Sequence, residues 1–304
     1  MLEAAREALC EVGVLGHDQP MPPFMARMSG NLALLVYPPG QAFYLVKIGL
    51  QSNLRREFDG FSAGHAAYPE GVPRPLALSR HRSFSTLVTT GIRYAPLGAP
   101  AMQNPVPGLQ RGLAAFFAAT RTEFSVDMKT PHSQRIRDAF EILASAVAPE
   151  SWHRYVDAVA ESVDRLPAIR QHGDFSLNNL GLRQSALVVL DWEDFGRECV
   201  PGYDVALLLL SLNQFNVTRV AQSTSDTGMH RWILRAGTED TGLSRSLFIR
   251  LLPAYLALIA RMKSQRGYRP DLAPQAVGGL LDALARTDDD LSAGTAAVPN
   301  GSRE

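Results

Sequence analysis

The chain has 304 residues, of which 46% are hydrophobic and 20% charged, and its 30 basic residues balance its 30 acidic residues. A chain of this length and composition can bury a large core and is expected to form two domains or lobes. The balanced charge gives no basis for binding nucleic acid or an anionic membrane. The apolar run 205–210 is far too short to span a bilayer, and residues 1–7 lack the apolar core of a signal peptide, so the cytoplasm is the expected location.

Cysteine and histidine usage excludes two further classes of protein. Cys10 and Cys199 are the only two thiols, so no disulfide framework is implied. The seven histidines are scattered without the spacing of zinc ligands, which argues against a structural zinc site.

The first part of the chain has the pattern of a β-rich unit. The runs 33–37 and 42–48 are rich in apolar, β-branched and aromatic residues and surround a Pro/Gly turn, which predicts a β-hairpin. Residues 53–61 have the apolar spacing of a short helix. Two further strands are predicted at 72–78 and 84–90, followed by a Pro-, Gly- and Ala-rich connection over 94–107.

Beyond this connection the apolar spacing becomes helical, with intervals of three and four residues. Helices are predicted at 109–119, 133–147, 152–166, 204–215, 243–262 and 273–291. The stretch 216–241 is polar and irregular, with a mobile loop expected at 223–228. His230 and Trp232 beside it fit local packing better than a pocket.

The segment with the strongest chemical signal lies between these helices. His172, Gly173 and Asp174 are followed by Asn179, and the apolar run 186–190 then ends at Asp191-Trp192-Glu193. The spacing from Asp174 to Asn179 is that of a kinase catalytic loop, where the aspartate orients the attacking hydroxyl and the asparagine holds magnesium. Asp191, at the strand end, is then the expected second metal contact.

The same segment spells Asp194-Phe195-Gly196, the D-F-G tripeptide of protein kinases. The apolar strand stops at residue 190, so Asp191 is the first residue to leave the sheet, whereas Asp194 is expected further out in the following turn. A carboxylate at a rigid strand end is better fixed than one on a loop. We therefore predict Asp191 as the metal ligand, and leave open whether Glu193 contacts a second metal.

These residues resemble the aminoglycoside phosphotransferase and choline kinase-like family, with its H-G-D-x-x-x-x-N loop and D-W-E strand end. The following segment, 201–206, is similar to that family's G-x-x-x-D-L-A element, in which the aspartate, here Asp204, opens a helix and braces the catalytic loop. The resemblance covers much of the chain. It implies a bilobal, protein kinase-like α+β fold with a small β-rich N-terminal lobe over 1–92 and a larger, mainly helical lobe over 93–294. The small, polar residues of 295–304 predict a disordered tail.

The resemblance also implies roles in the N-terminal lobe. Lys47, near the end of the second strand of the hairpin, would contact the nucleotide phosphates and pair with an acid of the next helix, for which Glu57 is preferred and Asp59 is the rival. The short Ser29-Gly30-Asn31 segment would stand in place of a glycine-rich phosphate loop. The backbone around the strand end would pair with the nucleotide base, through Thr89, Gly91 and Ile92.

The function that follows is magnesium-dependent transfer of the γ-phosphoryl group of ATP or GTP to a hydroxyl of a small molecule, with a sugar, aminoglycoside-like or amino-alcohol acceptor. No nucleic-acid or membrane partner is expected, and the sequence does not indicate an oligomeric state. Two alternatives stay open: a pseudokinase that binds nucleotide or a partner without turnover, motivated by the reduced glycine loop, and nucleotidyl transfer on the same fold.

Overall fold

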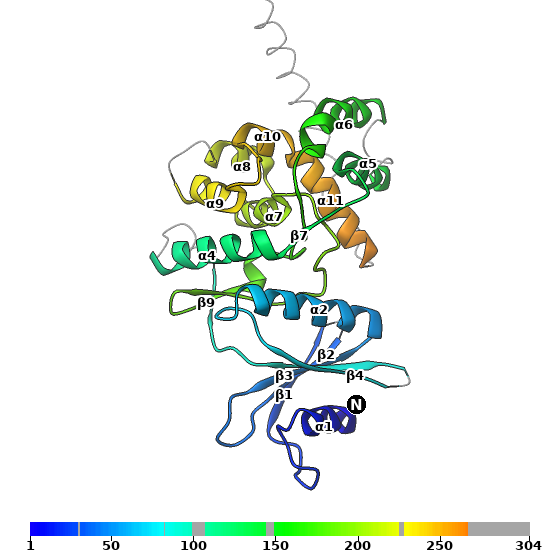
Figure 1. The fold of residues 1–304 in the computed structure, drawn as a ribbon, viewed down its shortest axis with the longest axis vertical. Helices are drawn as coiled ribbons and strands as arrows, with labels where there is room; N and C mark the ends of the chain where they lie inside the picture. The colour runs from blue at the N-terminus through cyan, green and yellow to red at the C-terminus, as the bar shows by residue number, and fades with distance from the viewer. Residues whose placement is uncertain (30, 82, 99–106, 144–148, 225–227, 267–304) are drawn as a thin grey trace, which may run out of the picture.

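A computed structural model describes residues 1–29, 31–81, 83–98, 107–143, 149–224 and 228–266. It has two lobes, an N-terminal one built on an antiparallel sheet and a C-terminal one built mainly from helices (Figure 1). The expected bilobal α+β fold is therefore confirmed. The expected helix at 273–291, the tail at 295–304 and Gly30 lie outside the described residues, and the lobe boundary at 92/93 stays a prediction. None of the helices in these ranges is long and apolar enough to cross a membrane.

The N-terminal sheet has the strand order β1-β2-β3-β5-β4, and every neighbouring pair is antiparallel. The predicted hairpin corresponds to β2 (Asn31–Val36) and β3 (Tyr44–Gly49), and the two further strands to β4 (Pro75–Arg80) and β5 (Ser85–Thr90). The edge strand β1 (Phe24–Ser29) was not predicted. Its pairing with β2 brings Ser29 opposite Asn31.

One helix covers each face of this sheet. α1 (Leu2–Glu11), also missed by the sequence pattern, packs its small residues on Leu34, Val46 and Val88. α2 (Gln51–Ala67) lies on the opposite face, between the sheet and the helical lobe (Figure 1). Side chains alternate along a strand, so Lys47, between the buried Val46 and Ile48, must point toward α2.

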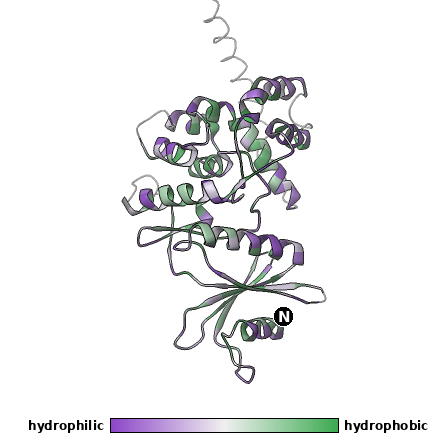
Figure 2. Ribbon diagram, viewed as in Figure 1, coloured by the Kyte–Doolittle hydropathy of each residue, from purple (hydrophilic) through white to green (hydrophobic). Residues whose placement is uncertain are grey.

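The C-terminal lobe is a cluster of helices around a large apolar core. α7 (Tyr203–Leu212) and α11 (Leu252–Gln265) lie side by side at its centre, and both carry hydrophobic colour over much of their length (Figure 2). The helices around them are α4 (Pro107–Glu123), α5 (His132–Ile142), α6 (Pro149–Asp164), α8 (Val217–Ser223), α9 (Met229–Thr238) and α10 (Arg245–Arg250).

Two helix predictions need correction. The stretch 216–241 contains α8 and α9, whose polar outer faces hid the apolar positions Val220 and Ile233 that pack inward. Residues 225–227 of the mobile loop expected at 223–228 lie outside the described residues. The single helix predicted at 243–262 is two helices, α10 and α11, that meet at Leu251. Pro253 falls in the first turn of α11, where a missing backbone N–H costs nothing.

Short strands position the predicted catalytic segment between the lobes. β9 (Leu180–Arg183) and β10 (Ala186–Val189) form a hairpin, to which β6 (Ala95–Pro96) adds a third strand. β7 (Ser125–Val126) pairs with β8 (Ala168–Ile169), just before the His172-Gly173-Asp174 segment. The catalytic loop therefore runs from one strand pair to the other through a short 3-10 turn, η1 (Leu177–Asn179).

Candidate active site

Lys47, Glu57 and Asp191 come together from three separate elements. The Lys47 ammonium lies 2.5 Å from Glu57 Oε1 and 3.0 Å from Asp191 Oδ1, so it bridges α2 and the end of β10. Glu57 is fully buried and Lys47 nearly so. The rival Asp59 is half exposed and pairs instead with Arg55 on the same helix, at 3.1 Å. The structure thus places Glu57, and not Asp59, beside Lys47.

Burial and charge act against each other in this cluster. Burial lowers the pKa of Lys47, but the Glu57 and Asp191 carboxylates outweigh it and hold that pKa above its usual value. Burial raises the pKa of Glu57 to about 7, although the Lys47 ammonium acts in the opposite direction. For Asp191, the attraction of Lys47 outweighs burial and keeps the pKa below its usual value. Asp191 is therefore ionised at neutral pH, as a metal ligand must be.

Two glycines of α2 allow this helix to approach the catalytic segment closely. A Cβ at Gly60 would lie 2.8 Å from Trp192 Cβ, and a Cβ at Gly64 would lie 2.7 Å from the Trp192 ring. Glycine inside a helix costs about 1 kcal/mol relative to alanine, so its presence at two positions four residues apart needs a packing reason. Trp192 supplies it, because the buried indole occupies the space where the side chains would be. The contact holds Glu57, one turn earlier on α2, next to Asp191.

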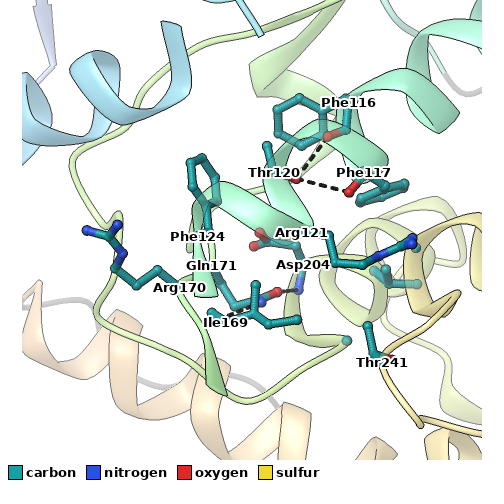
Figure 3. A pocket seen from close by; sticks show the side chains of 13 residues that line it. Phe116, Phe117, Thr120, Arg121, Phe124, Ile169, Arg170, Gln171, Asp204 and Thr241 are labelled. Atoms are coloured by element: carbon teal, nitrogen blue, oxygen red, sulfur yellow. Dashed lines mark hydrogen bonds between the residues drawn. The ribbon is translucent and has the colours of Figure 1, made fainter. Parts of the chain in front are cut away.

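The catalytic loop is braced from below by Asp204, at the start of α7. Its carboxylate accepts the backbone N–H groups of His172 (2.7 Å) and Gly173 (3.0 Å). Its own N–H donates to Gln171 Oε1 at 3.1 Å, a bond drawn in Figure 3 beside a cavity of about 40 Å³ that Asp204 and Gln171 line. The role expected for Asp204 agrees with these contacts. Gly173 has φ +91° and a Cβ there would be 2.6 Å from Asp194 Cβ, so only glycine suits the position.

His172 links the catalytic loop to the strand that carries Asp191. Its Nε2 is 2.9 Å from the carbonyl oxygen of Leu190, and its Nδ1 accepts the N–H of Asp174 at 3.2 Å. Because a carbonyl only accepts, the proton must be on Nε2. Burial lowers the pKa of His172 to about 4, so the ring is neutral at pH 7 and can accept through Nδ1. The buried histidine therefore connects the backbone of Asp174 to the strand end that carries Asp191.

Asp174 and Asn179 both line the large pocket between the lobes. The Asn179 amide donates to the Asp174 carbonyl at 2.9 Å, which turns its side-chain oxygen away from that bond and leaves it to bind a cation. Burial raises the pKa of Asp174, assisted by the nearby Asp191 and Asp194, while Arg266 opposes the change. A raised pKa suits a carboxylate that accepts a proton during the reaction.

Asp191 leaves the strand in an unusual backbone conformation. Its φ is +61°, in the left-handed region that few residues other than glycine adopt, and Asp is among the exceptions. The turn directs its carboxylate to Lys47, with the side chain 35% exposed. Backbone strain of this kind collects at functional sites.

Asp194 differs from its predicted position. It does not lie further out than Asp191 but is buried, with its side chain only 2% exposed. Its carboxylate pairs with Arg197 at 3.2 Å and with Arg266. Chain order along the turn was misleading here, because the turn folds back under Gly173 and covers Asp194.

Arg266 was missed by the sequence reasoning. It follows α11 and contacts three carboxylates of the site, Asp174 at 3.7 Å, Glu193 at 3.0 Å and Asp194. No local motif marks it, since its contacts all belong to a segment far earlier in the chain. The positive charge of Arg266 offsets part of the charge of the acidic segment.

The remaining predicted contacts lie at the two ends of β3, with Thr89 opposite Leu45 near its start and Asn31 beside Gly49 at its end. Thr89, in β5, is buried and its hydroxyl has no hydrogen-bond partner among the described residues. The Gly91 N–H already donates to the Phe43 carbonyl at 2.8 Å, so this N–H is not free for a base. Ile92 follows in the connection. Asn31 closes over Gly49, where a Cβ would be 2.0 Å from Asn31 Oδ1.

The donor atoms near Asp191 suit a hard cation. Carboxylate oxygens of Glu57, Asp191 and Glu193 all lie within 4.8 Å of one another, and Glu57 Oε2 is buried without a hydrogen-bond partner in the described part of the chain. Oxygen donors are those that magnesium prefers. Lys47 and Arg266 neutralise part of the negative charge of these carboxylates. Asp191 lines the pocket and has the most exposed side chain of the three, so it is the most accessible oxygen ligand.

Comparison with known proteins places this arrangement in a known fold. A scan against protein-family models and a search of the curated proteins find no match. Solved structures do match. A putative aminoglycoside phosphotransferase from Ralstonia eutropha is 15% identical, with a TM-score of 0.61 over 94% of this chain and 96% of that one. An amicoumacin kinase in complex with AMP-PNP, Ca²⁺ and its substrate is 14% identical, with a TM-score of 0.59 over 91% and 93% of the two chains. A choline/ethanolamine kinase family protein from Mesorhizobium loti is 15% identical, with a TM-score of 0.58 over 92% and 94%. The fold is therefore that of small-molecule kinases.

Proposed function

We propose that this protein is a magnesium-dependent small-molecule kinase that transfers the γ-phosphoryl group of ATP or GTP to a hydroxyl of its acceptor. The observation that carries the proposal is the convergence of Lys47, Glu57 and Asp191 beside a catalytic loop that presents Asp174 and Asn179 to one pocket. Phosphoryl transfer depends on positioned cations and an oriented nucleophile. This set of residues provides both.

Each residue then has a defined task. Lys47, aligned by Glu57, would bind phosphate oxygens of the nucleotide, and Asp191 with Asn179 would hold magnesium, which would supply charge that neutralises the phosphates. Asp174 orients the acceptor hydroxyl. As that oxygen forms its bond to the γ-phosphorus, the bond from phosphorus to the leaving diphosphate oxygen breaks, and the hydroxyl proton passes to the Asp174 carboxylate.

The N-terminal lobe would bind the nucleotide, and the interlobe pocket would bind the acceptor. The Ser29-Gly30-Asn31 segment would cover the phosphates, and the backbone near Thr89, Gly91 and Ile92 would face the base, through groups other than the Gly91 N–H. The amicoumacin kinase binds AMP-PNP and Ca²⁺, which favours ATP with a divalent ion here. Of the acceptors suggested by the sequence, a hydroxyl-rich, sugar-like compound suits the pocket best, for the charge reasons developed below.

A screen with magnesium-ATP and magnesium-GTP against hydroxylated metabolites tests the proposal, with product masses as readout. Addition of phosphate supports a kinase, addition of nucleotide would indicate nucleotidyl transfer, and no product with any acceptor would indicate a pseudokinase. The matched control is Asp174→Asn. It should lower turnover by about two to four orders of magnitude and leave nucleotide affinity nearly unchanged. Near-normal turnover of this variant would contradict the assigned role of Asp174.

A further inference from the structure

The pocket that receives Asp174 continues along a wall formed by α7 and α11. It has a volume of about 930 Å³, enough for a sugar-sized molecule. Beyond the catalytic loop it is lined by apolar side chains and by a few polar ones, namely Leu207, Ser211, Gln214, Phe215, Ile259, Met262 and Lys263. In the proposed kinase this wall is the place for the acceptor, because it lines the same pocket as Asp174, which orients the hydroxyl.

The acidic side chains that line the pocket are already engaged. Asp191 pairs with Lys47, Asp194 pairs with Arg197 and Arg266, and Asp174 is kept for the hydroxyl. Among the described lining residues no further carboxylate remains to bind an ammonium group. Within the part of the pocket that the structure describes, an acceptor with amino groups would therefore leave its charge without a carboxylate partner, which is costly where the charge is desolvated.

Lys263, one of the basic residues that line the pocket, shows the opposite situation. Lys263 is half-buried in α11 and pairs with no carboxylate among the described residues; its ammonium lies 5.1 Å from the centre of the Phe215 ring. It precedes Arg266 by one helical turn, so it lies on the same side of the helix as the residue that contacts Asp174. A lysine held at the pocket wall without an acidic partner is a binding group for an anion.

The backbone next to Lys263 is held in an uncommon conformation. Gln214 and Phe215, which follow α7, have φ values of +53° and +59°, and the turn is fixed by the Phe215 N–H donating to Leu210 O at 2.7 Å. Two successive non-glycine residues in the left-handed region cost energy that ordinary chain reversal would avoid by using glycine. The turn brings both side chains to the pocket, and the exposed Gln214 amide has two N–H donors to offer.

We propose that the acceptor of this kinase carries an anionic group, a carboxylate or a phosphate, which Lys263 and the Gln214 amide bind while its hydroxyl lies at Asp174. Phe215 and the apolar side chains of α7 and α11 contact the carbon skeleton. A sugar acid or a sugar phosphate has the required chemistry, whereas an aminoglycoside or an amino alcohol does not. This inference depends on the proposed function.

Matched compounds test the charge preference directly. Binding of gluconate, glucitol and 1-amino-1-deoxyglucitol, which share one carbon chain, is measured by calorimetry with the protein saturated with magnesium-ADP. Glucose 6-phosphate and glucose separate phosphate from carboxylate. At least one anionic compound should bind about 10- to 100-fold more tightly than its neutral parent, the range for a charge-assisted hydrogen bond. The amine should bind most weakly.

Substitution of Lys263 identifies the group responsible. Lys263→Met keeps the apolar stem and should remove the preference for the anion, raising the acceptor KM with little change in kcat. Lys263→Arg should retain it. Lys129, an exposed lysine outside the pocket, provides the control Lys129→Ala, which should behave like the natural protein.

Three results would overturn the inference: equal or tighter binding of the amine, no binding of any anionic compound, or an anion preference that persists in Lys263→Met. Failure of the proposed function looks different. In that case magnesium-ADP itself fails to bind, or no acceptor of any charge gains phosphate. Intact nucleotide binding together with phosphorylation of a neutral or cationic acceptor contradicts the acceptor class alone.

Discussion

Replacing Lys47 by methionine, Glu57 by glutamine, and both together measures whether the two residues act through one contact. Lys47→Met leaves the fully buried Glu57 without its cation. Removing one partner of a buried ion pair lowers the free energy of unfolding by about 3–5 kcal/mol. Glu57→Gln is milder, about 1–3 kcal/mol, because Lys47 keeps Asp191 at 3.0 Å. The double variant should be less impaired than the sum by about 1–3 kcal/mol, the coupling of residues in contact.

The assay is the free energy of unfolding from denaturant titration, together with the affinity for magnesium-bound nucleotide from fluorescence titration and kcat for the best acceptor. Asp59→Asn is the matched control, since it removes a negative charge from the same helix at a residue that is half exposed and paired with Arg55. Its effect should add to that of Lys47→Met within about 0.5 kcal/mol. Additivity of Lys47→Met and Glu57→Gln to the same precision would refute the shared contact.

Four further substitutions separate other parts of the site. Asp191→Ala should abolish magnesium-dependent activity, whereas Asp194→Asn, at a buried residue paired with two arginines, should lower the melting temperature and spare magnesium affinity; the reverse pattern would move the metal to Asp194. Gly64→Ala gains about 1 kcal/mol of helix propensity, yet should reduce both melting temperature and kcat, because its Cβ would be 2.7 Å from the Trp192 ring; a more stable, fully active variant would show that α2 can move freely. Burial raises the pKa of Asp174 and Arg266 opposes this, so Arg266→Met should raise it further. Activity needs the ionised carboxylate, so the acid limb of the kcat–pH profile should move to higher pH, and an unchanged limb would contradict the coupling.

The parts of the fold that the sequence predicted are those with strong local patterns. The hairpin of β2 and β3 has β-branched and aromatic runs around a Pro/Gly turn, and α2 has a clear apolar spacing. β1 was missed because its sequence does not alternate between apolar and polar residues. It lies at the edge of the sheet, where the apolar Phe24, Met25 and Met28 are exposed. α9 was missed because its apolar positions lie within a stretch that is polar on average.

The candidate site likewise contains residues that a local motif predicts and residues that only the tertiary structure brings together. Asp174, Asn179 and Asp191 belong to one contiguous motif, and their proximity follows from a loop and a hairpin that the sequence marks. Arg266 and Lys263 line the same pocket from the end of α11, and no local sequence pattern predicts this position. Only the packing of α11 against α7 brings them there, and such packing is decided by the whole core rather than by neighbouring residues.

The contacts of Trp192 explain why a tryptophan stands between the two acidic residues at the strand end. The indole N–H donates to Val189 O at 3.1 Å, and its ring lies 4.6 Å from that of His172, so it fixes the backbone on either side of Asp191. The opposite side of the same residue contacts α2 at Gly60 and Gly64. A displacement of α2 would therefore move Glu57 away from Lys47 and Asp191 and also disturb the support of the catalytic loop. Trp192, next to the proposed metal ligand, therefore links α2 to the catalytic loop. We expect nucleotide binding at Lys47 to change the environment of Asp174 through the contacts of Trp192.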